Sequence, residues 1–306
     1  MRAVSLLPSA TELCYALGVE PVGVSHECDH PPAANDQPVV VHSRVDADAS
    51  STEIDEQVRE AVATGGVYEL DRERLRALDP DVILSQGVCE VCAVDDADVH
   101  RAVADLGLDA DIVTTDPHSL GDVFADLERI GAALDRGERA REVAAGWRDR
   151  VTDIERTTPD KGPRVAVLDW LDPVMVAGHW VPGMVERVGG QYGLADAGDP
   201  SRPREWADIR EYDPEVLVAA PCGFNIAQTH ENWTDLTARE GWPSLTAVAN
   251  DRVYALDGDQ YVNRPGPRLV DTLELLAGIL NPDHPPTVAD RDGVRRLSGP
   301  ADRPRV

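Results

Sequence analysis

Short apolar runs alternate along the chain with segments whose apolar residues recur at helical spacing. The short runs are typical of buried strands, and the amphipathic segments are typical of helices packed on a sheet. Strands are predicted at 2–7, 22–26, 39–42, 82–86, 111–114, 164–169, 174–177, 216–220 and 253–256. Helices are predicted from Ser9 to Gly18 and at 51–63, 71–78, 95–106, 181–189, 231–238 and 267–280. This alternation favours an α/β fold with mostly parallel sheets flanked by helices.

Two predicted helices begin with the spacing of a capping box. Ser9 is followed three residues later by Glu12, and Ser50 is followed by Glu53. In such a box the serine and glutamate side chains satisfy free backbone amides at the start of a helix. Both segments are therefore expected to start helices in this way.

The middle of the chain predicts one long helix, with Gly131 and Gly137 as its possible weak points. Residues 119–156 contain no proline, and apolar residues recur there at helical spacing. A helix of about 38 residues would be about 57 Å long, which suits a rod joining two lobes. The predicted organisation is an N-terminal α/β lobe at 1–118, the connecting helix at 119–157, a C-terminal α/β lobe at 158–281, and a poorly ordered tail at 282–306 that is rich in Pro, Asp, Arg and Gly.

The net charge of the chain argues against a nucleic-acid partner and indicates a protein that works in concentrated salt. The 306 residues carry 56 Asp and Glu against 29 Lys and Arg, a formal net charge of −27, and Lys161 is the only lysine. A chain this acidic repels the phosphate backbones of nucleic acids, and nucleic-acid binding is therefore not expected. Lysine depletion with a large acid excess is typical of proteins that work in concentrated salt, where charge repulsion is screened. We therefore interpret this acidic protein as halophilic.

The sequence gives no sign of membrane insertion. No apolar run approaches the roughly 20 residues that span a bilayer, and the start, Met-Arg-Ala-Val-Ser-Leu-Leu-Pro, has no signal-peptide pattern. Taken as it stands, this start predicts a cytoplasmic protein. A true start further upstream would instead predict an extracytoplasmic one.

Cysteine and histidine residues follow two of the predicted strands. His26, Cys28 and His30 come after the second strand, and Cys89 and Cys92 come after the strand that ends at Gln86. The carboxyl ends of parallel strands share one edge of a sheet, so the two segments can meet. Cys28, Cys89, Cys92 and His26 are therefore candidate metal ligands, with packing and thiol-redox chemistry as the alternatives. No nucleotide-binding glycine motif occurs.

Tryptophans concentrate in the second half. Trp170 and Trp206 lie at predicted strand or turn ends, where a flat ligand could stack on them. Trp233 and Trp242 are weaker candidates, and core packing is the alternative for all four.

Several segments together resemble a known family. Residues 2–18 and 22–32, followed in order by 75–84, 180–190 and 259–268, resemble the cobalamin-binding proteins of ABC importers. The resemblance implies two lobes joined by a rigid helix, with a corrinoid held between them. It covers nearly the whole chain to about residue 281.

The resemblance also implies a set of site residues. By position, the ligand contacts implied are His30, Tyr68, Asp169, Trp170, Trp206, Asp259 and Arg264. Asp259 and Arg264 correspond to a polar pair in the last loop, and His30 is placed to approach the cobalt. Glu73 and Glu186, one on each lobe, correspond to acids that dock on a permease. The segment 50–68 and the Cys89–Cys92 motif depart from the family pattern.

The leading hypothesis is therefore a binding protein and not an enzyme. Cobalamin or a related corrinoid would be its ligand, no catalytic cofactor is expected, and an ABC permease is the implied partner. The alternatives are a haem, ferric-siderophore or metal-ion carrier that uses Cys and His ligands, or a cytoplasmic corrinoid-handling or thiol-redox enzyme that uses Cys89 and Cys92.

Overall fold

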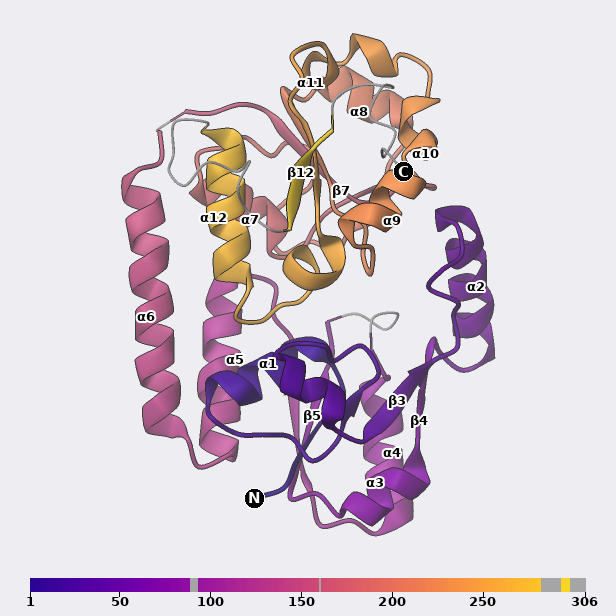
Figure 1. Cartoon of the computed structure of the whole chain (residues 1–306), viewed down its shortest axis with the longest axis vertical. Coiled ribbons are helices and arrows are strands. Elements are labelled where there is room, and N and C mark those ends of the chain that lie inside the picture. The colour runs from indigo at the N-terminus through magenta and orange to yellow at the C-terminus, as the bar shows by residue number, and fades with distance from the viewer. Residues whose placement is uncertain (89–92, 160, 282–292, 298–306) are drawn as a thin grey trace.

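Two α/β lobes are stacked along the long axis of the molecule and joined on one side by a pair of helices (Figure 1). The structure is a computed structural model that describes residues 1–88, 93–159, 161–281 and 293–297. The two largest clusters of buried apolar side chains correspond to the two lobes. The predicted fold class is confirmed.

The N-terminal lobe is built on parallel strands. Its strands are β1 (Ala3–Ser5), β2 (Val24–Ser25), β3 (Val39–Ser43), β4 (Tyr68–Leu70), β5 (Val82–Gln86) and β6 (Asp111–Thr115). They form two sheets, β1-β5-β6 and β2-β3-β4, which are linked by a parallel bridge between Val4 and Gly23. Among the described strands of this lobe, β4 alone is antiparallel, and it pairs with β3. The helices of the N-terminal lobe are α1 (Pro8–Ala16), η1 (Pro32–Asp36), α2 (Ser51–Thr64), α3 (Arg72–Leu78) and α4 (Asp96–Leu106).

The C-terminal lobe contains one six-stranded sheet in the order β12-β11-β10-β7-β8-β9. The strands are β7 (Val165–Trp170), β8 (Met175–Val176), β9 (Arg202–Pro203), β10 (Val216–Ala219), β11 (Val253–Leu256) and β12 (Val294–Arg296). The helices are α7 (Val181–Arg187), α8 (Trp206–Tyr212), α9 (Ile226–Glu231), α10 (Thr234–Thr237), η2 (Trp242–Ser244), α11 (Thr246–Ala249), η3 (Gly258–Val262) and α12 (Leu269–Leu280). The predicted helix 231–238 is shortened to α10, and α9 precedes it as a separate short helix that was not predicted.

The predicted poorly ordered tail contains an ordered segment. Val294–Arg296 pairs antiparallel with β11, and Val294 and Leu297 are buried. This short strand covers the edge of the sheet, which would otherwise expose unpaired backbone groups. The prediction was wrong for 293–297, and the remainder of 282–306 lies outside the described residues.

The connection between the lobes is a helical pair, which corrects the predicted single rod. Helix α5 (Leu120–Ala133) ends where Asp135 adopts a φ of +56°, and α6 (Gly137–Arg156) then runs back beside it. Each helix contacts both lobe cores: Val123 and Val151 lie in the C-terminal core, and Ile130 and Ala144 in the N-terminal core. Two helices that each bury side chains in both lobes hold the lobes more firmly than one rod would.

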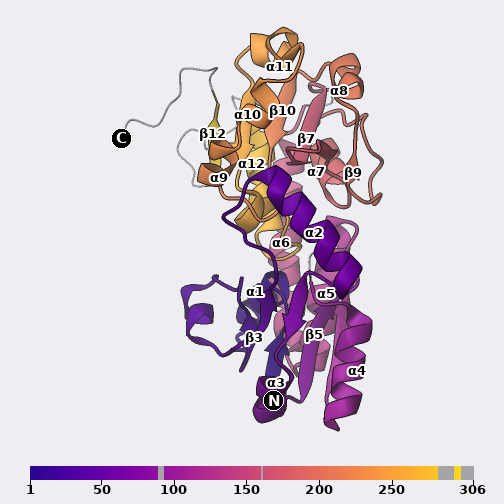
Figure 2. The same ribbon diagram turned by 90° about the vertical axis from the view of Figure 1, so that its right-hand side faces the viewer.

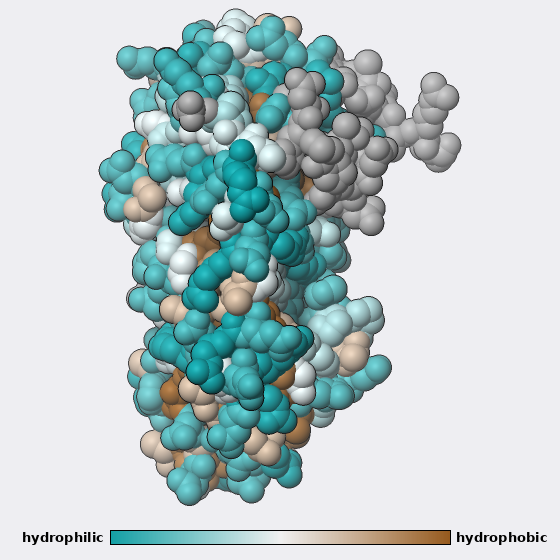
Figure 3. Space-filling view, turned by 90° about the vertical axis from the view of Figure 1, so that its left-hand side faces the viewer, coloured by the Kyte–Doolittle hydropathy of each residue, from teal (hydrophilic) through white to brown (hydrophobic). Residues whose placement is uncertain are grey.

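The surface on the α6 side is largely hydrophilic (Figure 3), consistent with the acid excess of the chain. Within the described residues no helix combines the length and apolar character needed to span a bilayer.

Candidate functional site

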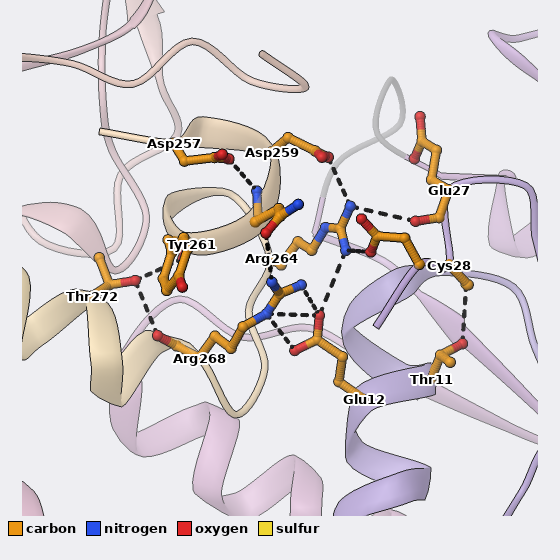
Figure 4. A network of polar contacts seen from close by, with 12 residues as sticks. Thr11, Glu12, Glu27, Cys28, Asp257, Asp259, Tyr261, Arg264, Arg268 and Thr272 are labelled. Atoms are coloured by element: carbon orange, nitrogen blue, oxygen red, sulfur yellow. Dashed lines mark hydrogen bonds and ion pairs between the residues drawn. The ribbon is translucent and has the colours of Figure 1, made fainter. Parts of the chain in front are cut away.

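Two arginines in the loop after η3 reach from the C-terminal lobe to the N-terminal lobe. Arg268 donates from Nε to both carboxylate oxygens of Glu12, at 3.1 Å each, and a second guanidinium nitrogen also bonds Glu12 Oε1 (Figure 4). The side chains of Glu12 and Arg268 are only 2% and 8% exposed. The ion pair is therefore buried at the junction of the lobes.

Glu12 does not form the predicted capping box with Ser9. Helix α1 is capped at Leu7 without a side-chain hydrogen bond, and Pro8 occupies its first turn, where a missing amide costs nothing. Glu12 instead turns to Arg268. The second predicted box is confirmed, because Ser50 and Glu53 cap α2 reciprocally.

Arg264 connects the same two lobes. Its guanidinium donates to Asp29 Oδ1 at 2.5 Å and to the backbone oxygen of Glu27 at 3.4 Å, both on the N-terminal lobe. On its own lobe it donates to Asp259 Oδ1 at 2.8 Å, and it lies 3.6 Å from Glu12 Oε1. The sequence-predicted pair of Asp259 and Arg264 is thus in direct contact, at an interface between lobes.

Carboxylates outnumber the arginines at this junction. We call the group the interlobe acidic cluster, and it consists of Glu12, Glu27, Asp29, Asp257 and Asp259 around Arg264 and Arg268.

Burial shifts the pKa values of several acids in the interlobe acidic cluster. Burial raises the pKa of Glu12 against the opposing effect of Arg268. Burial and the charge of Asp259 raise the pKa of Glu27. Burial raises the pKa of Asp257 to about 6. Burial alone would lower the pKa of Arg264, but Asp259 and Asp29 raise it, so its charge is firmly held.

Tyr68 and His26 stand beside this cluster. The Tyr68 hydroxyl donates to Glu27 Oε1 at 3.4 Å, and His26 Nε2 lies 3.7 Å from the same oxygen. The Tyr68 and His26 rings are 5.9 Å apart. Partial burial lowers the pKa of His26, so its imidazole is neutral at pH 7. His30 is exposed and interacts electrostatically with Glu12.

Cys28 is placed for packing. Its side chain is buried with Val24 and Ala34, and Sγ lies 3.1 Å from Thr11 Oγ1. Burial raises the pKa of the thiol to about 11, so it is protonated at pH 7. Among the described residues no three His, Cys, Asp or Glu side chains are grouped so as to hold a metal ion. Cys89 and Cys92 lie outside the described residues.

A second interlobe contact forms where α2 meets the C-terminal lobe. Ile54 of α2 packs in a buried cluster with Trp170 and Phe224, whose rings are 5.2 Å apart. Figure 2 shows α2 running across the junction of the lobes. The backbone oxygen of Phe224 accepts hydrogen bonds from Gly258 and Asp259, at 3.0 and 3.1 Å. Phe224 therefore joins this apolar contact to the interlobe acidic cluster.

Polar contacts anchor the start of α2 on the same lobe. The Ser51 hydroxyl donates to Asp235, and the Ser51 amide donates to Asn232 Oδ1 at 3.2 Å. Thr52 Oγ1 donates to Asp172 Oδ2 at 3.1 Å. The segment that departs from the family pattern thus bridges the two lobes in this protein.

Trp206 and Asp169 lie apart from these contacts. Trp206 stacks on Trp242 at 6.1 Å, lies beneath Arg239, and donates to the backbone oxygen of Glu240 at 2.8 Å. Asp169 accepts a hydrogen bond from Ser201, and burial raises its pKa to about 6. No contact joins either residue to Arg264 or His30 within the described part of the chain.

The two predicted docking acids are exposed, one on each lobe. Glu73 lies in the first turn of α3, and Glu186 lies near the end of α7.

Sequence reasoning missed several residues that make the interlobe contacts. Glu12, Glu27, Asp29, Ile54, Phe224 and Arg268 were not predicted as site residues. The only available signals were local: the segment Glu27 to Asp29 follows a strand at the ligand-binding edge of a parallel sheet, and Ile54 lies in the segment that departs from the family pattern.

The chain belongs to the family described as "Periplasmic binding protein", whose model matches residues 4–260.

Similar proteins of known sequence include transporter and vitamin-binding proteins. An uncharacterised ABC transporter substrate-binding lipoprotein of Bacillus subtilis is 24% identical over 92% of this chain and 80% of its own. A vitamin B12-binding protein of Vibrio cholerae is 25% identical over 89% of this chain and 86% of its own.

Solved structures with the same fold carry different ligand names. A periplasmic vitamin B12-binding protein of Vibrio cholerae matches with a TM-score of 0.67 and 22% identity, covering 91% of this chain and 95% of its own. A periplasmic haem-binding protein of Pseudomonas aeruginosa matches with a TM-score of 0.68 and 20% identity, covering 92% and 93%. These similarities show the two-lobe fold.

Proposed function

We propose that this protein binds a corrinoid between its two lobes and presents it to an ABC permease, without catalysing a reaction. The observation that carries the proposal is the meeting of residues from both lobes around Arg264, at the edge where the parallel strands of the N-terminal lobe end. Ligands of open parallel sheets bind at that edge. The vitamin B12-binding relatives support a corrinoid as the ligand.

The proposed contacts come from both lobes. Tyr68 and His26 offer ring edges beside Glu27, and the buried Trp170–Phe224 pair supports the loop that carries Asp259. Aromatic surface flanked by a few polar groups suits a large, flat ring with polar substituents. His30, exposed near Glu12, is the proposed residue for approach to the cobalt.

The proposed partner is a permease that bears cationic docking residues. Glu73 and Glu186 are exposed on separate lobes and could each pair with one such residue. The relatives are named as periplasmic proteins or lipoproteins, and we propose that this chain also works outside the cytoplasm.

A second candidate function is haem binding. The specific observation in its favour is the adjacency of Tyr68 and His26, since phenolate and imidazole are both iron ligands. The haem-binding structural relative supports this candidate.

Titration calorimetry of the full chain with cyanocobalamin, dicyanocobinamide, haem and zinc distinguishes these functions. The proposal predicts saturable one-to-one binding of a corrinoid and weaker binding of haem. Saturable binding of haem with no corrinoid binding would establish the second candidate. Binding of zinc alone would contradict both.

A further inference from the structure

Building on the proposed function, we infer that the interlobe acidic cluster selects ring ligands with amide substituents over the same rings bearing carboxylates. The proposal concerns which class of ligand the site accepts. Corrinoids carry amide side chains, whereas haem carries two propionates.

The first step is that both arginines of the cluster are already neutralised. Arg264 donates to Asp29 and Asp259, and Arg268 is held by Glu12. A cationic site for a ligand carboxylate needs a guanidinium with free donors that a ligand can reach. The Arg264 side chain is only 7% exposed, so it is both paired and covered.

The second step is that the accessible groups of the cluster are acceptors. The side chains of Glu27, Asp29 and Asp259 are 40%, 37% and 31% exposed. Carboxylate oxygens are hydrogen-bond acceptors. Ligand amide N–H groups can donate to these oxygens, whereas a ligand carboxylate would face like charge without a donor.

Tyr68 and His26, which stand beside Glu27, add no positive charge at neutral pH. Partial burial lowers the pKa of His26, which leaves it neutral, and the Tyr68 hydroxyl already donates to Glu27. The local balance near the ligand is therefore negative.

The net charge of the whole chain offers a competing explanation, because a protein of charge −27 repels every anion from a distance. A test must separate that general effect from the cluster. Asp105 provides a matched control: it also pairs with an arginine, Arg72, at 2.8 Å, but on an exposed part of the N-terminal lobe. Asp105→Asn changes the net charge by the same amount as a substitution in the cluster.

The experiment compares dicyanocobinamide with dicyanocobyrinic acid, in which carboxylates replace the amides on the same ring. Calorimetry with the full chain is expected to show at least about tenfold tighter binding of the amide form, the effect of a few like-charge contacts. Asp29→Asn and Asp259→Asn, each able to accept and donate while freeing Arg264, should each reduce this ratio at least about threefold. Asp105→Asn should leave the ratio unchanged.

Equal binding of both corrinoids by the unaltered protein would overturn the inference while leaving the proposed function intact. So would an equal reduction of the ratio by Asp105→Asn, because that result assigns the selectivity to net charge. The paired Asn variants guard against loss of one variant through misfolding, which far-UV circular dichroism detects. Binding of neither corrinoid would mean that the proposed function itself has failed.

Discussion

Arg268 of the C-terminal lobe and Glu12 of the N-terminal lobe form a buried ion pair, although 256 positions separate them in the sequence. The pair lies where the loop after η3 crosses to helix α1. Together with the contacts of Arg264 and of α2, it adds to the α5–α6 pair in fixing the relative position of the lobes.

The Glu12–Arg268 pair predicts a strong non-additive effect on stability. Glu12→Leu should lower the free energy of unfolding by about 3 kcal/mol, because it leaves a buried guanidinium without its partner. The double variant Glu12→Leu with Arg268→Met should recover most of that loss, since no charge then remains buried unpaired. Urea denaturation measures both, and a double variant as unstable as the sum of the single variants would refute this account.

Helix α2 should loosen when its apolar anchor is removed. Ile54→Ala deletes a side chain packed against Trp170 and Phe224, and such truncations cost about 2–4 kcal/mol in a buried site. Trypsin cleavage after Arg59, an exposed residue on α2, should then become at least about tenfold faster, since proteolysis reports local opening. Val62→Ala, at an exposed position of the same helix, is the control and should leave the cleavage rate unchanged.

Asp169 should make stability depend on pH in a definite direction. Burial raises its pKa from the ordinary 3.8 to about 6, so the folded state binds a proton that the unfolded state has released between about pH 4 and pH 6. Its contribution to stability is fully present below pH 4 and is lost as the pH rises through 6.

Asp169→Asn should remove this penalty. Relative to the parent protein, the variant should gain up to about 3 kcal/mol of unfolding free energy between pH 4 and pH 7, the value of two pKa units. The free energy of unfolding is measured by denaturation at pH 4 and pH 7 for both proteins. The difference between the two proteins at each pH cancels the effect of the remaining acids. A stability difference that does not change with pH would rule out the assigned titration.

Trp170 and Trp206 should differ in their effect on the ligand. Trp170 lies in the interlobe apolar contact, whereas Trp206 packs against Trp242 and Arg239 within the C-terminal lobe. Trp170→Phe should weaken corrinoid binding about tenfold, because it loosens the contact with Phe224 that supports the Asp259 loop, and Trp206→Phe should leave binding within about twofold. Calorimetry measures the corrinoid affinity of the two matched variants. A larger loss of affinity in Trp206→Phe than in Trp170→Phe would place the ligand site at Trp206.

Local patterns predicted the elements of the fold well. Strands β5 and β11 occur at the predicted residues, because buried parallel strands read as continuous apolar runs. The turn between α5 and α6 left only a weak signal, Gly131 and Gly137, which a continuous helix can also contain. Leu134, Asp135 and Arg136 are compatible with a helix, and the reversal is stabilised by packing such as the close approach of Gly131 to Ala140.

The candidate site was less predictable because its contacts are tertiary. Ser9 and Glu12 have capping-box spacing, yet an arginine of the other lobe takes the carboxylate of Glu12. Resemblance to the family predicted Asp259 and Arg264 as site residues, but no local pattern indicates that Arg264 contacts Asp29, 235 positions away. Trp206 is a residue type on which a flat ligand can stack, but in the structure its ring packs against Trp242 and Arg239.

Hydrogen–deuterium exchange with and without dicyanocobinamide tests most directly whether the ligand lies between the lobes. At a saturating ligand concentration, amide exchange is predicted to slow both in residues 26–30 of the N-terminal lobe and in residues 257–264 of the C-terminal lobe. Both segments should become protected over the same range of ligand concentration. Saturable binding with protection confined to one lobe would contradict a site shared by the two.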